Sequence, residues 1–125
     1  MDDYKQAAVR WWRDGDCLFQ SERYGGASHA FGLAAECAVK YAMDCLPGGE
    51  RDLPHRHLPE LIDDGKRWLS GRARCGLYQL LNTQGYMEGW NIANRYWADK
   101  AFSAEAAGRY REHARRTCKA ADLGV

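Results

Sequence analysis

The stretch from Gly25 to Leu46, GGASHAFGLAAECAVKYAMDCL, constrains the fold of this chain more than any other feature. Alanine and glycine dominate it, and their small side chains allow neighbouring helices to approach closely. Its apolar residues recur at helical spacing over about residues 27–46. We therefore expect a central helix of a compact bundle, preceded by a tight turn at Gly25–Gly26.

The remainder of the chain predicts further helices around this one. β-Branched residues are scarce, and only three prolines occur, which favours an all-α protein. Asp2 or Asp3 can cap the first helix, and Ser103 can cap the last. The length suits one domain, residues 1–125, with its own core. The sequence predicts an up-and-down bundle of four to five helices, at residues 2–23, 27–46, 58–69 with a further run to 81, 90–101, and 103–124.

Charge and composition exclude several classes of function. The formal net charge of +1 provides no global field that would attract nucleic acid or a membrane. No run of 18 apolar residues occurs, so we expect no membrane span, and the first residues, MDDYKQ, predict no signal peptide. The five cysteines form no Cys-x-x-Cys pair, which is typical of a reduced, cytoplasmic protein.

Motifs for cofactors, metals and covalent catalysis are missing from the sequence. There is no Walker-type loop, no Gly-x-Ser-x-Gly and no His-Glu-x-x-His. His55 and His57 alternate between two prolines, but a zinc site needs three or four ligands. We therefore expect no cofactor, no metal and no catalytic residue.

Three polar side chains of the central helix, His29, Glu36 and Lys40, fall on one stripe because they are spaced by seven and four residues. The stripe has three interpretations. It is a solvated edge, on which Glu36 pairs with Lys40 one turn later. Alternatively, Glu36 faces Arg95 and locks two helices together. Lastly, Arg95 and the adjacent Tyr96 join the stripe in a site for a ligand such as phosphate.

Two surfaces are candidates for binding a partner. The last helix carries a basic run, which is either a solvated face or a patch for RNA, DNA or an acidic protein: Arg109, Arg111, Arg115, Arg116 and Lys119. The five tryptophans are too many for one small core, so some of them are expected at an interface. A homodimer is the simplest such interface.

Several segments resemble proteins of the HEPN-domain family. RWWRDGDCLFQSERYGGASHAFGLAAECAVKYAM is similar to the first two helices of that family. His57-Leu58-Pro59, at the loop and third helix, and the later segment Trp90–Tyr96 also resemble the family. The resemblance covers about residues 4–122. It implies a bundle of four or five helices that often dimerises and that occurs in prokaryotic toxin–antitoxin and defence systems. Some members cleave RNA with an Arg and a His that are separated by four to six residues, near the start of a late helix.

This sequence departs from that nuclease pattern. No histidine follows Arg95 at the required spacing, and Arg109 is separated from His113 by only three residues. Arg23 and His29 fit the spacing but lie across the expected first turn. The leading hypothesis is a non-catalytic protein-binding or accessory protein of a toxin–antitoxin or defence-type system. The alternatives are a nucleotide- or RNA-binding module, and a metal-independent RNase that uses one of these Arg/His pairs.

Overall fold

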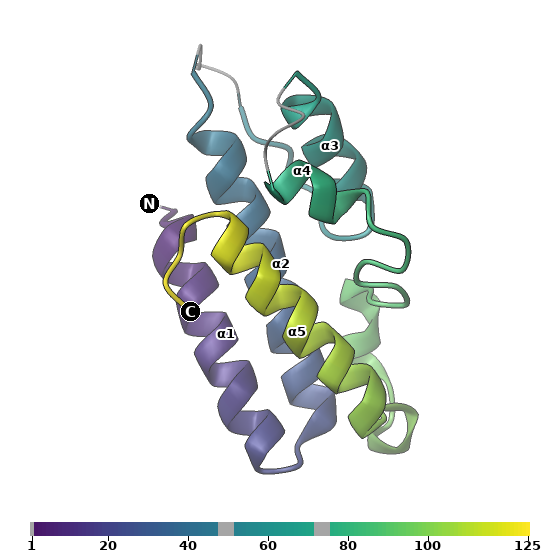
Figure 1. Cartoon of the computed structure of the whole chain (residues 1–125). Coiled ribbons are helices and arrows are strands. Elements are labelled where there is room, and N and C mark those ends of the chain that lie inside the picture. Colours follow the sequence, from purple (N-terminus) through teal and green to yellow (C-terminus); the bar gives the residue numbers. More distant parts are fainter. Residues whose placement is uncertain (1, 48–51, 72–75) are drawn as a thin grey trace.

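Three long helices pack side by side in the computed structural model, which describes residues 2–47, 52–71 and 76–125 (Figure 1). They are α1 (Tyr4–Gln20), α2 (Tyr24–Asp44) and α5 (Ala104–Ala120). All regular structure within these three ranges is helical, which confirms the all-α prediction. No helix in the same ranges is both long enough and apolar enough to cross a membrane.

The helices α2 and α5 run in the same direction, and α1 runs opposite to both (Figure 1). At the start of α5, a Cβ added to Gly108 would lie 3.9 Å from the Phe19 ring near the end of α1. Near the end of α5, Cys118 packs in one buried cluster with Ala8 of α1 and Ala38 of α2. The chain between α2 and α5 must therefore return to the end of the bundle where α1 and α2 are joined.

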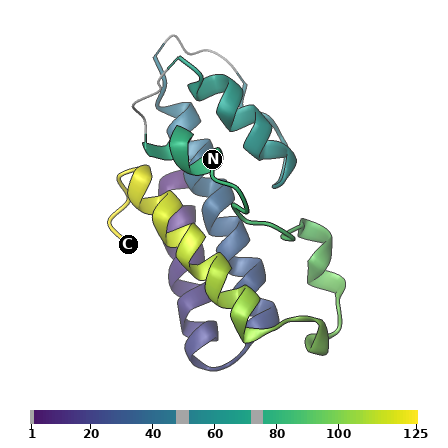
Figure 2. The same cartoon turned by 45° about the vertical axis from the view of Figure 1, so that its right-hand side comes forward.

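Short elements make this return, in place of the fourth long helix of an ideal up-and-down bundle. The helices α3 (Glu60–Leu69) and α4 (Gly76–Leu81) cover one end of α2. Turns follow, in which Gly85 and Gly89 have φ values of 83° and 85°. Two 3₁₀ helices, η1 (Ile92–Tyr96) and η2 (Asp99–Ala101), then lead to α5 (Figure 2). The predicted helix at 90–101 is therefore two 3₁₀ helices.

The core supports the prediction that α2 is central. Its alanines at 27, 34, 35 and 38 are fully buried, and Phe31 lies among them. The helices α1 and α2 pack so closely that a Cβ added to Gly15 would lie 2.8 Å from the Phe31 ring and 3.2 Å from the Ala30 Cβ. Small residues on both helices permit this contact, and close packing excludes water from the core.

The turn between α1 and α2 lies earlier than predicted. The helix α2 begins at Tyr24, so Gly25 and Gly26 belong to its first turn. Residues 21–23 make the reversal instead, with Glu22 at a φ of 60° and Arg23 N donating to Leu18 O at 2.8 Å. The predicted caps at the other ends are confirmed: Asp3 Oδ1 accepts from Gln6 N, and Ser103 Oγ accepts from Ala106 N.

Candidate functional site

Tyr96 and Trp97 are the large hydrophobic side chains that lie exposed in the described part of the chain, at 78% and 52%. Arg95 lies beside them, with its Cζ 4.5 Å from the centre of the Tyr96 ring. The Arg95 Nη1 donates to Ile92 O at 2.8 Å, which fixes the guanidinium over the ring. We call Arg95, Tyr96 and Trp97 the 95–97 surface.

The segment that carries this surface, residues 90–102, packs against two glycines of α2. The Trp90 indole lies directly on Gly32, where an added Cβ would be 1.8 Å from Trp90 Cε2. Its Nε1 donates to Ser28 O at 2.8 Å. At the other end, the Phe102 ring lies 3.0 Å from a Cβ added to Gly25. The segment is thus anchored at both ends against α2, and the 95–97 surface lies between the anchors.

Glu36 does not contact Arg95, so the predicted Glu36–Arg95 ion pair is wrong. Its side chain is also not part of a solvated edge, because it is only 4% exposed. Its carboxylate oxygens lie 2.9 and 3.0 Å from His57 Nδ1, and Oε1 also accepts a hydrogen bond from Leu58 N at 3.1 Å. Through these contacts, Glu36 holds the loop before α3 against the middle of α2. Arg95 instead donates to Ile92 O and lies over the Tyr96 ring.

His29 lies between two tryptophans. Its ring centre is 6.3 Å from Trp11 in an edge-on arrangement and 6.4 Å from Trp90 in a stacked one. Burial lowers the pKa of His29 below its usual 6.5, and the nearby charge of Arg95 lowers that pKa further. His29 is therefore an uncharged, half-buried group next to the 95–97 surface at neutral pH.

Lys40 does not pair with Glu36 either. Its Nζ lies 5.9 Å from the centre of the Tyr4 ring of α1. The structure thus places His29 and Lys40 on the half-buried edge of α2 that faces α1, and it places Glu36 beneath the His57 loop. The three members of the stripe have three different partners.

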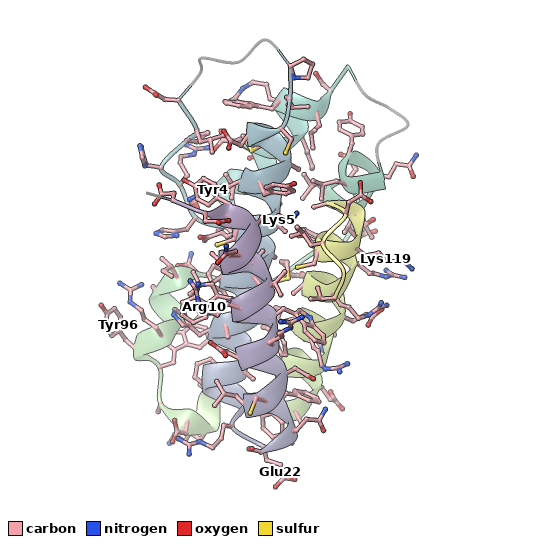
Figure 3. The ribbon with its side chains drawn as sticks, turned by 90° about the vertical axis from the view of Figure 1, so that its left-hand side faces the viewer. Tyr4, Lys5, Arg10, Glu22, Tyr96 and Lys119 are labelled. Atoms are coloured by element: carbon pink, nitrogen blue, oxygen red, sulfur yellow. The ribbon has the colours of Figure 1, made fainter. Side chains whose placement is uncertain are left out.

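The basic run on α5 is partly neutralised by acidic residues. The Glu112 carboxylate accepts from Arg115 at 2.6 Å and lies 3.7 Å from Arg116 Nε. Arg111 donates to Asp16 of α1 at 2.7 Å. Arg109 and Lys119 are exposed and form no ion pair within the described ranges. Figure 3 shows Lys119 and Tyr96 on different sides of the molecule, so the basic run and the 95–97 surface are separate.

Neither candidate Arg/His pair forms a contact. His29 packs between tryptophans, whereas Arg23 is the exposed residue just before α2. His113 Nδ1 accepts a hydrogen bond from Met87 N at 3.0 Å, and the His113 ring stacks on Tyr86 at 5.5 Å. Burial, followed by the charge of Arg116, lowers the pKa of His113 below 6.5. The hydrogen bond and the stacking explain why His113 is held in place.

The described residues form neither a metal-binding cluster nor an activated buried thiol. Among residues 2–47, 52–71 and 76–125, no three His, Cys, Asp or Glu side chains lie close enough together to hold a metal ion. Cys17, Cys37, Cys45 and Cys118 are free thiols, and Cys75 lies outside the described residues. Burial raises the pKa of Cys37 to about 11 and that of Cys118 to about 12. Neither of these two thiols is activated as a nucleophile.

A second buried carboxylate, Asp64, was not predicted from the sequence. Asp64 of α3 is 4% exposed and lies 2.8 Å from Arg56 Nε and 3.0 Å from Arg67 Nη2. Arg56 and His57 are neighbours, so consecutive residues of one loop reach Asp64 and Glu36. The spacing Asp64–Arg67 was a signal for the local pair, since residues three apart share a helix face. No comparable spacing in the sequence indicated that Arg56, in the loop before α3, would also contact Asp64.

Comparison with known proteins gives no relative, because no protein-family model, no curated protein and no solved structure matches the chain. Function is therefore inferred from the residues and their geometry.

Proposed function

We propose that this protein is a non-catalytic protein-binding module of the HEPN-like type, an accessory subunit of a prokaryotic toxin–antitoxin or defence-type system that works in the cytoplasm. The 95–97 surface is the observation that carries the proposal. Trp, Tyr and Arg are the residue types most enriched among the side chains that dominate protein–protein binding. Here they are consecutive and largely exposed, and the segment that carries them is anchored against α2 at both ends.

The surroundings of the histidines support a non-catalytic role. RNA cleavage by an Arg/His pair needs a histidine that exchanges a proton at the substrate while the arginine stabilises the phosphate. His57 is held by Glu36, and His113 by Met87 N. His29 is packed between two rings and has a lowered pKa. Each of these contacts gives its histidine a structural role.

A second copy of this chain is one partner that the 95–97 surface would fit, since the homodimer predicted from the surplus of tryptophan needs an exposed aromatic patch. Sedimentation of the purified protein measures this directly. A dimer that dissociates when Tyr96 and Trp97 are replaced by serine would identify the partner as a second copy.

Affinity purification from the native organism tests the proposal. The tagged wild type is compared with the double variant Tyr96→Ser/Trp97→Ser and with the control Arg116→Ser/Lys119→Ser on α5. We expect a protein partner that is retained by the wild type and the control and is lost with the double variant. Because both serines replace exposed side chains, circular dichroism should show an unchanged helix content.

An RNA assay completes the test. Purified protein should leave single-stranded RNA intact. Cleavage that is abolished by His29→Ala or His113→Ala would contradict the proposal and would favour the RNase alternative. RNA retained by the wild type and lost with the α5 variant would instead favour the RNA-binding alternative.

A further inference from the structure

One edge of α2 is left partly open between α1 and the segment that carries the 95–97 surface. Four residues on this edge are half-buried: His29, Leu33, Cys37 and Lys40. We call them the α2 strip. They are spaced by four, four and three residues, so they lie in one row on the helix. At 1.5 Å per residue, the row is about 16 Å long, which corresponds to about three helical turns.

His29, Leu33 and Cys37 form the floor of the α2 strip, and this floor is uncharged at neutral pH. Leu33 is apolar, and the raised pKa of Cys37, about 11, keeps its thiol protonated. The lowered pKa of His29 keeps that imidazole neutral. The Trp11 ring of α1 borders the floor through its contact with His29.

Basic side chains surround this floor. Arg10 of α1 and Cys37 line a shared depression of about 370 Å³. Lys40 lies at one end of the strip, over Tyr4, and Arg95 lies near His29 at the other. Arg10 and Tyr96, both labelled in Figure 3, come from the two elements that flank α2 on this side. Basic side chains therefore lie at both ends of the floor and beside it at Arg10, where Asp2 and Asp3 line the same depression.

Five arginines elsewhere in the described ranges pair with a carboxylate, unlike the two arginines of the rim. Arg56, Arg111 and Arg115 each lie within 2.8 Å of a carboxylate oxygen. Arg10 and Arg95 form no ion pair within residues 2–47, 52–71 and 76–125. The acidic residues at the edge of the depression have other contacts, since Asp3 caps α1 and Asp2 accepts from Tyr4 OH at 3.3 Å.

We infer that the α2 strip and its rim bind an acidic amphipathic segment of a partner protein, with apolar side chains on the floor and carboxylates at Arg10, Lys40 and Arg95. This inference rests on the proposed protein-binding function and names the chemistry of the partner. It extends the 95–97 surface by about three helical turns along α2. A helix laid in an apolar groove is a recurrent way of recognising a peptide.

A protein fits this surface better than RNA does. Binding to RNA gains strength with each phosphate that is neutralised, and the rim offers three cations beside Asp2 and Asp3. The floor carries no charge at neutral pH, and Leu33 and Cys37 on it suit leucine-like side chains. The exposed aromatic rings at 96 and 97 could also stack on bases, so RNA is included as an outcome of the test.

The test uses two fluorescent 16-residue helical peptides with the same leucine face, one with glutamate and one with glutamine at the remaining positions. Binding to the full chain is measured by fluorescence anisotropy at two salt concentrations. We expect the glutamate peptide to bind more tightly and to weaken with salt. Arg10→Gln/Arg95→Gln should reduce its affinity by about tenfold. The control Arg109→Gln, an exposed and unpaired arginine on α5, should leave that affinity unchanged.

The outcomes separate this inference from the proposed function. If both peptides bind equally and both are lost with Tyr96→Ser/Trp97→Ser, protein binding stands and the acidic partner is wrong. If the glutamate peptide does not bind, or if single-stranded RNA displaces it, the inference is overturned. Amide shifts confined to residues 29–40 and the Trp11 indole in nuclear magnetic resonance spectra would place the bound peptide on the α2 strip.

Discussion

At Gly32, α2 has no side chain beneath the Trp90 indole, and this lets the segment before η1 lie directly on the helix backbone. The sequence places Gly32 in the predicted central helix but does not say which residue covers it. That partner is 58 positions away along the chain, so helical periodicity carries no information about it. The contact of Trp90 with Gly32, which positions the 95–97 surface, could therefore not be predicted from the sequence.

Gly32→Ala should destabilise the protein by about 1–3 kcal/mol, because the new methyl group would overlap the Trp90 ring. Urea unfolding followed by circular dichroism measures the change. Gly76→Ala is the matched control, since its added Cβ meets nothing within 4 Å. Equal stabilities for the two variants would mean that Trp90 does not lie on Gly32.

Glu36→Gln should lower the free energy of unfolding by about 1–2 kcal/mol, since it removes the charge that faces His57 but keeps an oxygen for Leu58 N. The effect stays below that of a fully buried pair because the His57 side chain is 50% exposed. Chemical denaturation of this variant is compared with that of Glu22→Gln, which changes an exposed carboxylate. A loss no larger than that of the control would show that the loop is not held by Glu36.

Helical elements were predicted well where local signals are strong. Apolar spacing predicted α1, α3 and α5 to within a few residues, and capping residues predicted where α1 and α5 begin, because both signals act within one or two turns. The turn at residues 21–23 was missed because Gly25–Gly26 is the stronger glycine signal. Those glycines instead serve close packing, as the contact between Gly25 and Phe102 shows.

The packing of α5 against the turn at residues 85–89 depends on an uncharged His113. Its Nδ1 accepts from Met87 N, which a protonated imidazole cannot do. Because the pKa of His113 is lower in the folded protein than its usual 6.5, the unfolded chain binds more protons as the pH falls below 6.5. His29 has a pKa shifted in the same direction. Both residues therefore stabilise the fold above pH 6.5 and lose this effect in acid.

We expect the free energy of unfolding to fall as the pH drops from about 7 to about 5, and to fall less in His113→Gln. Denaturation curves measured across this range provide the comparison. His55→Gln, which changes an exposed histidine, should keep the slope of the wild type. If His113→Gln keeps that slope too, the hydrogen bond to Met87 does not control the pH response.

At the scale of the whole molecule, composition predicted an all-helical domain, and the alanine-rich stretch predicted its central helix. The path of residues 82–103 from α4 to the start of α5 was not predicted correctly, because it depends on contacts between residues that are far apart in the sequence. The same path carries the 95–97 surface. The proposed binding surface is thus located in the part of the fold that local sequence signals describe least.

Photocrosslinking in the native cell tests the 95–97 surface most directly. A photoreactive phenylalanine analogue, benzoylphenylalanine, replaces Trp97 in one protein and Lys119 in a second, and the adducts are identified by mass spectrometry. We predict a covalent protein adduct from position 97 and none from position 119. Adducts from position 119 alone, or RNA in place of protein at position 97, would contradict the proposal.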